Sequence, residues 1–277
     1  MGKGESTRWD HQSPPTAADR EDPPGVEHPA EIIPVDYDRH RLRILAESKY
    51  ERSWRARFSR REPWTVAWLE RETRRGDTVY DIGANVGVFS LIGATLLHGE
   101  GLLVAFEPGF SSYARLCENI ALNGLSSMVV PVPLALSSTS GLQAFTYRTQ
   151  HPGQSRHAFS ADAWTPADSD RHKRYTQPMA SVTLDEVVPL LRLPRPNLVK
   201  LDADGAEAHI LRGGRNTLSS QECRSVLVEI DETRTNDSVS LLESYGFRLE
   251  DEHKRKKSSQ IWYGAFRRAG VNPEQRA

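Results

Sequence analysis

The feature that most constrains the fold is a glycine-containing turn between an apolar strand and an amphipathic helix. It reads Asp-Ile-Gly-Ala-Asn-Val-Gly over residues 81–87 and follows a β-branched run. Gly83 and Gly87 remove side chains where the backbone must turn tightly and let a ligand approach. Asn85 tolerates unusual backbone angles and offers an amide. The turn predicts a nucleotide-cofactor cradle, whose candidate residues are Asp81, Gly83, Ala84, Asn85 and Gly87.

A second apolar strand, residues 102–107, ends in an acid twenty positions after Gly87. In nucleotide-binding βαβ units, an acid at that distance accepts hydrogen bonds from the two ribose hydroxyls, so Glu107 is the predicted ribose ligand. The turn lacks the Gly-x-Gly-x-x-Gly spacing of dinucleotide enzymes, because Asn85 replaces the second glycine. A cofactor without phosphate, S-adenosylmethionine, fits better. The alternative is a glycine-rich turn with a purely structural role.

Composition limits the possible classes of function. The 277 residues suffice for one α/β domain with appendages, and the formal net charge of -1 gives no overall attraction to nucleic acid or to an anionic membrane. The two cysteines, Cys117 and Cys223, lack metal-ligand spacing and are predicted to be free thiols. No apolar run reaches membrane-spanning length and the N-terminus is polar, so we expect no membrane insertion and a cytoplasmic location.

The pattern along the chain predicts four regions. Residues 1–36 are rich in proline, glycine and charge and are expected to be a disordered leader. Residues 37–75 carry apolar side chains at helical intervals and predict a helical extension. Residues 76–268 form the predicted catalytic domain and 269–277 a flexible tail. Strands and helices alternate in the domain, which predicts a parallel sheet covered on both faces; the expected elements are 78–82, 86–97, 102–107, 111–123 and 128–132.

The second half of the domain continues this alternation after an irregular stretch. Residues 142–147 predict an antiparallel or edge strand, and the polar segment 148–178 predicts either disorder or a functional lid. His151, His157 and His172 in that segment lack metal-ligand spacing. Thr183 is a predicted helix N-cap. The later elements are expected at 197–201, 206–218, 225–230 and 238–245, followed by a terminal antiparallel pair, 247–249 with 261–266.

Three acids follow the strand at 197–201, which places them at the same sheet edge as Asp81 and Glu107. Asp202, Asp204 and Glu207 are the candidate catalytic residues: one orients the methionine amine or the acceptor, and one accepts the acceptor's proton. The structural alternative is that Asp204 or Asp202 caps the following helix and Glu207 complements its dipole. Methyl transfer from a sulfonium is an in-line displacement that needs no covalent nucleophile. No histidine accompanies the acids at ligand spacing, so no metal is predicted.

Several motifs together resemble the FkbM-type methyltransferases. They are residues 81–87, Ala-Phe-Glu-Pro at 105–108, Asn-Ile-Ala-Leu-Asn-Gly at 119–124, Thr-Leu-Asp at 183–185, Val-Lys-Leu-Asp-Ala-Asp-Gly-Ala-Glu at 199–207 and Leu-Arg-Gly at 211–213. The resemblance covers about residues 62–230. It implies an α/β class I (Rossmann-like) three-layer sandwich, with a mostly parallel sheet and a terminal antiparallel strand pair. It also implies S-adenosylmethionine as cofactor and O-methylation of sugars or secondary metabolites.

The resemblance also implies roles for individual residues. The turn at 81–87 would surround the methionine portion, Glu107 and the adjoining Pro108 the ribose, and Ala135 with Leu136 the adenine, while Asp202 would face the methyl-transfer centre. Two positions depart from the family pattern. Asp204 stands where the family usually has glutamate, and Ser138 where it usually has an acid.

The expected acceptor is a small-molecule or glycosylated metabolite. A methyltransferase for RNA or another macromolecule, or a cofactor-binding homologue without activity, are the alternatives. The sequence lacks the basic track expected of an RNA methyltransferase. The three acids argue against a homologue without activity. We expect an acceptor pocket covered by segment 148–178 and by four aromatic residues, Trp54, Phe58, Trp64 and Trp68. The alternative is that these aromatic residues pack on the sheet. The sequence predicts no oligomeric state.

Overall fold

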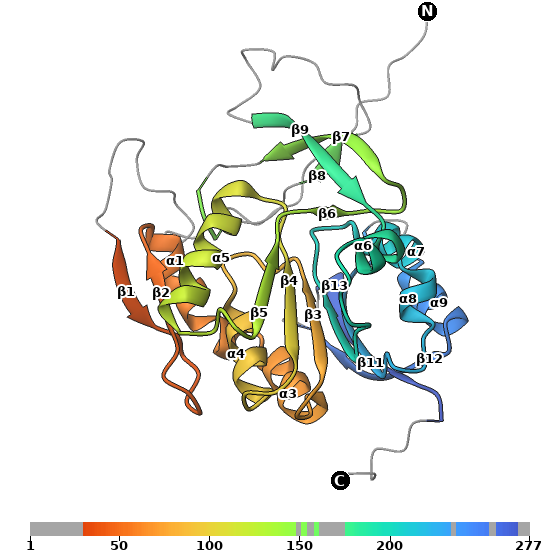
Figure 1. The fold of residues 1–277 in the computed structure, drawn as a ribbon, viewed down its shortest axis with the longest axis horizontal. Helices are drawn as coiled ribbons and strands as arrows, with labels where there is room; N and C mark the ends of the chain where they lie inside the picture. Colours follow the sequence, from red (N-terminus) through yellow and green to blue (C-terminus); the bar gives the residue numbers. More distant parts are fainter. Residues whose placement is uncertain are drawn as a thin grey trace, which may run out of the picture.

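The centre of the molecule is a seven-stranded sheet of order β12-β13-β11-β10-β3-β4-β5 (Figure 1). The computed structural model describes residues 30–147, 151–153, 158–160, 175–233, 237–254 and 259–270. Five strands are parallel, and β13 runs antiparallel between β11 and β12. This confirms the mostly parallel sheet and the terminal antiparallel pair. The strands are β3 (Thr78–Ile82), β4 (Leu102–Phe106), β5 (Val129–Val132), β10 (Leu198–Leu201), β11 (Ser225–Asp231), β12 (Phe247–His253) and β13 (Ile261–Arg268).

Helices cover both faces of this sheet, which confirms the predicted three-layer α/β fold. Side chains alternate along β3, so Val79 lies in one apolar core and Tyr80 in the other. The first core contains side chains of α3 (Pro63–Glu72), α4 (Val88–Leu96) and α5 (Phe110–Leu122). The second contains side chains of α6 (Leu184–Leu190), α7 (Glu207–Gly213), α8 (Arg215–Leu218) and α9 (Ser238–Ser244). Strand order reverses between β3 and β10, where open α/β sheets bind their ligands.

A second, four-stranded sheet has the order β6-β9-β7-β8 and lies above the carboxyl ends of the main strands in Figure 1. Its strands are β6 (Ala135–Leu136), β7 (Gly141–Tyr147), β8 (Ala158–Ser160) and β9 (Tyr175–Val182). The strand predicted at 142–147 is confirmed as β7, which pairs antiparallel with β9. The polar segment predicted at 148–178 includes β8 and the start of β9, while 148–150, 154–157 and 161–174, with His157 and His172, lie outside the described residues.

The N-terminal region differs from its predicted local structure. Residues 31–36 were expected to end a disordered leader and residues from 37 onward to be helical, but β1 (Glu31–Pro34) pairs antiparallel with β2 (Arg43–Ala46). The helices α1 (Lys49–Ser53), η2 (Arg55–Arg57) and α2 (Phe58–Arg61) begin only after this hairpin. Leader residues 1–29 and tail residues 271–277 lie outside the described residues. The division of the chain into four regions stays a prediction.

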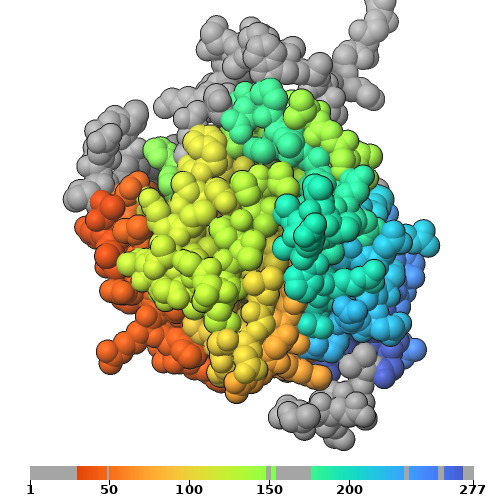
Figure 2. Space-filling model, viewed as in Figure 1, coloured from red at the N-terminus to blue at the C-terminus, as the bar shows by residue number. Residues whose placement is uncertain are grey.

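Side chains of α5 hold the hairpin in place, and local sequence does not reveal these contacts. Asn119 Oδ1 accepts a hydrogen bond from Leu45 N at 2.8 Å, and Asn123 Oδ1 accepts one from Arg43 N at 2.9 Å. Ile44, between them, is fully buried. Figure 2 shows the hairpin region in red against the yellow-green surface of α5. The amide nitrogen of the same side chain, Asn119 Nδ2, donates to Val86 O at 2.8 Å, so Asn119 connects the hairpin to the glycine turn.

Two further expectations concern cysteine and the membrane. Cys117 and Cys223 are both free, and Cys223 is buried. Among the helices in the described part of the chain, none combines the length and the apolar character needed to cross a bilayer.

Candidate functional site

The glycine turn lies where β3 gives way to α4, and its shape requires glycine. The N–H groups of Gly83 and Ala84 both donate to Phe106 O at 3.0 Å, which joins the turn to the end of β4. Gly83 has φ +81°, and a Cβ there would lie 1.8 Å from Asp202 O. Gly87 has φ 92° and is the N-cap residue of α4. The turn therefore approaches the β10 loop so closely that a side chain at position 83 has no room.

Asn85 and Glu107, the two residues on which the cofactor prediction depends, are in direct contact. Asn85 has φ 52°, and its N–H donates to Glu107 Oε2 at 2.8 Å. Gly109 N donates to the other carboxylate oxygen, Oε1, at 2.7 Å. Pro108, which is half-buried, connects Glu107 to Gly109. Each oxygen of this carboxylate keeps acceptor capacity beyond its one backbone hydrogen bond, so it can still receive a hydroxyl donor.

Burial changes the charge state of Glu107. The side chain is 5% exposed, and this desolvation raises its pKa to about 7, although the backbone hydrogen bonds from Gly109 and Asn85 and the charge of Arg55 act in the opposite direction. The charge of Asp204 raises the pKa of Glu107 further. Glu107 therefore exchanges its proton near neutral pH.

Asp81 lies deeper in the protein than the sequence predicted. It is 2% exposed, Lys200 Nζ contacts its Oδ1 at 2.9 Å, and Ser90 Oγ donates to its Oδ2 at 2.6 Å. Burial acts to lower the pKa of Lys200, but the charges of Asp81 and Asp202 outweigh it and the pKa is raised. The ion pair joins β3 to β10 beneath the glycine turn. A direct contact of Asp81 with the cofactor stays a prediction.

The three predicted catalytic acids occupy different environments. Asp202 is half-buried, and its backbone N–H donates to Ile82 O at 3.0 Å. Asp204 has φ 55°. Glu207 is 2% exposed, and its Oε1 accepts hydrogen bonds from Ala203 N at 2.8 Å and Gly205 N at 3.1 Å. Glu207 therefore holds the loop before α7 in shape, and burial raises its pKa to about 7. The N-cap residue of α7 is Ala206 and no side chain caps this helix, so neither Asp202 nor Asp204 has the capping role of the structural alternative.

Sequence reasoning missed a group of residues centred on the hydroxyl of Tyr263. This hydroxyl lies 2.8 Å from Glu229 Oε2, 3.2 Å from Glu62 Oε1 and 3.3 Å from Asp202 Oδ2. A phenol carries a single proton, so three carboxylates compete for one donor. Burial, reinforced by Asp202 and Glu207, raises the pKa of Glu229 well above its ordinary value. The available signal was a glutamate at position 229 within an otherwise apolar strand.

The same acids have a spacing that could hold a metal ion. One carboxylate oxygen from each of Asp202, Glu207 and Glu229 lies within 4.8 Å of the others. Such oxygen ligands suit a hard divalent cation. Protein hydrogen bonds already use the same groups, because Glu207 accepts from backbone N–H groups and Glu229 from Tyr263. The sequence-based expectation that no metal takes part stays a prediction.

The residues predicted near adenine and acceptor occupy different parts of the fold. Ala135 and Leu136 are buried in β6 at 2% and 4% exposure, on the second sheet. Trp68 is 2% exposed and its indole N–H donates to Ser225 Oγ at 2.9 Å, so Trp68 packs on the sheet. Trp64 is half-buried, with its ring centroid 5.5 Å from that of Tyr263. Of these two tryptophans, Trp64 is thus the one beside the acid group.

The sheet order, the covering helices and the glycine turn define a Rossmann-like α/β protein, whose candidate site lies at the strand ends. Residues 81–249, more than half of the chain, match the family described as Methyltransferase FkbM domain. The protein belongs to this methyltransferase family, which confirms the resemblance found in the sequence.

Similar proteins include characterised methyltransferases. Hexuronic acid methyltransferase AglP of Haloferax volcanii is 30% identical over 183 residues, which cover 65% of this chain and 66% of AglP. The matched part thus spans just under two thirds of that relative. 31-O-demethyl-FK506 methyltransferase FkbM of Streptomyces tacrolimicus is 26% identical, covering 65% of this chain and 76% of that protein. The solved structure of M. jannaschii TYW2 in complex with AdoMet is 14% identical, with 88% of each chain covered and a TM-score of 0.44.

Proposed function

We propose that the protein transfers the methyl group of S-adenosylmethionine to a hydroxyl group of a sugar or another small metabolite. The observation that carries this proposal is the contact between Asn85 N and Glu107 Oε2, at 2.8 Å, beside the glycine turn. It brings a diol-binding carboxylate and a backbone cradle together at adjoining strand ends. Membership of the FkbM methyltransferase family supports the same activity.

The site residues fit this cofactor in size and chemistry. Glu107 accepts the ribose hydroxyls through the acceptor capacity that its backbone hydrogen bonds leave. Gly83, Ala84, Asn85 and Gly87 surround the methionine portion, and the absence of a side chain at Gly83 keeps the turn close to the β10 loop. Ala135 and Leu136, which are buried in β6, provide apolar surface toward the adenine. When bound, the sulfonium supplies an activated methyl group.

Asp202 is the proposed proton acceptor. A carboxylate oxygen of Asp202 would take the proton that the acceptor hydroxyl loses when it is methylated. Tyr263 and Glu229 position that carboxylate, because the Tyr263 hydroxyl lies between them. Asp204 and Glu207 shape the loop that presents Asp202. The chain otherwise contributes alignment of the two reactants.

The relatives suggest which class of acceptor to test. One is named for a hexuronic acid and another for 31-O-demethyl-FK506. Both names fit a small-molecule or glycosylated acceptor, and the formal net charge of -1 offers no general attraction to a polyanion. We extend the proposal to action in a reducing cytoplasm, which the two free cysteines suit.

The test is transfer of an isotope-labelled methyl group to a fractionated metabolite extract, followed by mass spectrometry. The expected product is a methyl ether on a sugar or small metabolite, formed only with active protein and cofactor. Label found only in RNA or protein would contradict the proposed acceptor class. Cofactor binding with no labelled product in any fraction would favour the homologue without activity.

A further inference from the structure

Arg55 is a buried cation that forms no ion pair with a carboxylate in the described part of the chain. It lies in η2 with 7% of its surface exposed, and its guanidinium packs over the rings of Phe58 and Tyr50, at 4.8 and 5.6 Å from their centroids. Its Nε donates to Gly153 O. In the described part of the chain, no acceptor contacts its two terminal amino groups. A buried charge without a partner is costly, so a fold that keeps one points to a missing anion.

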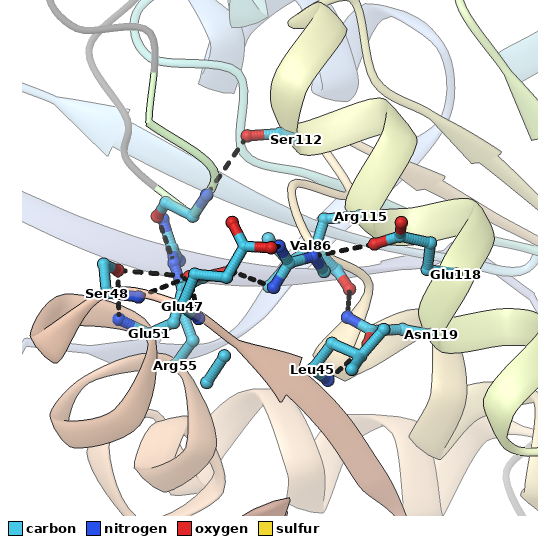
Figure 3. Close-up of polar contacts among 12 residues, drawn as sticks. Leu45, Glu47, Ser48, Glu51, Arg55, Val86, Ser112, Arg115, Glu118 and Asn119 are labelled. Carbon is cyan, nitrogen blue, oxygen red and sulfur yellow. Dashed lines mark hydrogen bonds and ion pairs between the residues drawn. The ribbon is translucent and has the colours of Figure 1, made fainter. Parts of the chain in front are cut away.

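Arg115 shows how this protein neutralises a buried guanidinium that has a structural role. It is 4% exposed and contacts three carboxylates, those of Glu47, Glu51 and Glu118, at 2.9 to 3.0 Å. Figure 3 shows these contacts beside Arg55, whose drawn contact runs to a backbone oxygen. The two arginines are similarly buried but differ in pairing. The local structure therefore supplies carboxylates for Arg115 and leaves the terminal amino groups of Arg55 available.

The position of Arg55 links it to the proposed cofactor site. A Cβ built on Gly153 would lie 3.1 Å from Glu51 Cγ, 3.4 Å from Arg55 Cγ and 3.7 Å from Cγ1 of Val86 in the glycine turn. The Phe58 ring beneath the guanidinium lies 5.3 Å from Phe89, in the first turn of α4. The charge of Arg55 also acts to lower the pKa of Glu107. The guanidinium thus lies near both the start of α4 and the proposed ribose ligand.

We propose that Arg55 binds the α-carboxylate at the amino-acid end of S-adenosylmethionine. A guanidinium pairs with a carboxylate through two parallel hydrogen bonds, which matches the two available amino groups. The first turn of α4 adds N–H groups that have no acceptor within the helix, and its dipole favours an anion. The inference rests on the proposed function, because Glu107 places the ribose at one end and the turn leads the methionine chain toward α4.

The test measures binding by calorimetry without turnover, using two ligands that differ by one group. S-adenosylhomocysteine carries the carboxylate, and S-adenosyl-3-thiopropylamine retains the amine but lacks the carboxylate. In the wild type, removal of the carboxylate is expected to weaken binding by roughly ten- to a hundred-fold, the range for a charged hydrogen-bonded pair. In Arg55→Gln this difference is expected to shrink to about two-fold or less, because both ligands then lack the same interaction.

Arg57→Gln is the matched control, since Arg57 belongs to the same short helix but is exposed. It should retain the wild-type difference between the ligands. Arg55→Lys keeps the charge and should retain part of the difference; thermal unfolding of each variant checks that it is folded. If Arg55→Gln fails to fold, the titrations of Arg55→Lys and of the wild type test the inference instead. Equal affinities of the wild type for both ligands would overturn it.

The remaining outcomes separate this inference from the proposed function. If Arg55→Gln weakens the binding of both ligands by the same factor, or leaves the binding of both unchanged, Arg55 does not bind the cofactor carboxylate and the inference is overturned. The second of these results would point to a carboxylate on the acceptor instead. If the wild type binds neither ligand at millimolar concentration, the proposed function fails, and this inference fails with it.

Discussion

At the scale of single residues, the proposed ribose ligand Glu107 should make cofactor binding depend on pH. Its pKa is raised to about 7 by burial, so the side chain is a carboxylate above neutral pH and a carboxylic acid below it. A carboxylate accepts hydrogen bonds from both hydroxyls of a diol, whereas the acid has lost part of that capacity. Affinity for S-adenosylhomocysteine is therefore expected to rise as pH increases from about 6 to 8. Calorimetric titration at several pH values checks this.

Replacement of Glu107 provides the control for this pH dependence. Glu107→Gln should bind the ligand more weakly and with little change between pH 6 and 8, because the titrating group is gone. Glu243→Gln, at an exposed position of α9, should follow the wild-type curve. An unchanged pH dependence in Glu107→Gln would assign the titration to another group.

Asp202 is the residue whose loss should affect chemistry more than binding. Asp202→Asn keeps the size of the side chain but removes the proton acceptor, so kcat is expected to fall by about 10² to 10⁴-fold. Affinity for S-adenosylhomocysteine should change much less. Asp38→Asn, at an exposed position of the N-terminal region, is the control and should leave kcat unaltered. A kcat for Asp202→Asn within a factor of two of wild type would exclude Asp202 as the base.

At the scale of elements, the turn after β3 is shaped by contact with the loop after β10. Gly83 and Gly76 have nearly equal φ angles, +81° and +82°, but a Cβ on Gly83 meets Asp202 O and one on Gly76 meets nothing within 4 Å. Gly76→Ala should therefore lower the free energy of unfolding by about 1 to 2 kcal/mol, the cost of the left-handed backbone. Gly83→Ala should lower it by about 1 to 3 kcal/mol more, because of the steric clash.

Urea unfolding of the two variants measures this difference. Gly83→Ala should also lose affinity for S-adenosylhomocysteine, while Gly76→Ala should keep it. Equal destabilisation of the two variants would show that the close approach of the β10 loop does not determine the residue at position 83.

The elements also show which parts of the structure were readable from the sequence. The parallel strands were predicted because a strand buried on both faces is a short apolar run, as in residues 102–106. Glu107 was found because its spacing from the turn reflects the length of one helix. The hairpin of β1 and β2 was missed, because its backbone groups bond to Asn119 and Asn123, more than 70 positions away.

Part of the site could not be predicted from the sequence either, because its residues meet through pairing of strands that are distant in the chain. Glu229 and Tyr263 are 34 positions apart and meet because β13 inserts beside β11 in antiparallel register. Lys200 was part of a recognised motif, but its pairing with Asp81 depends on β10 lying next to β3. Arg55 belongs to an arginine-rich stretch with no distinguishing local pattern. Only the folded chain shows that this arginine is buried and that its neighbours are exposed or paired.

At the scale of the whole molecule, buried acids determine how stability varies with pH. Burial raises the pKa values of Glu107, Glu207 and Glu229 above their ordinary values. Between pH 4.5 and 7 the folded state then binds more protons at these sites than the unfolded state does. Their contribution to stability is present at acidic pH, and for Glu107 and Glu207 it is lost as pH rises through about 7. For these groups, the free energy of unfolding falls from pH 5 to 8.

Glu207 isolates one part of this effect. Glu207→Gln keeps an oxygen that can accept from Ala203 N and Gly205 N but cannot titrate. The decrease in the free energy of unfolding between pH 5 and 8 should be smaller in Glu207→Gln than in the wild type, by up to about 3 kcal/mol. Glu243→Gln again serves as the control. Parallel pH profiles for wild type and Glu207→Gln would contradict a raised pKa at this position.

A crystal structure with S-adenosylhomocysteine tests the central claim most directly, because the claim concerns where one ligand lies. We expect both ribose hydroxyls within hydrogen-bonding distance of the Glu107 carboxylate. We also expect the homocysteine chain along residues 83–87 and its sulfur toward Asp202. A nucleoside bound away from Glu107, or a side chain filling the space between Asn85 and Asp202, would contradict the account.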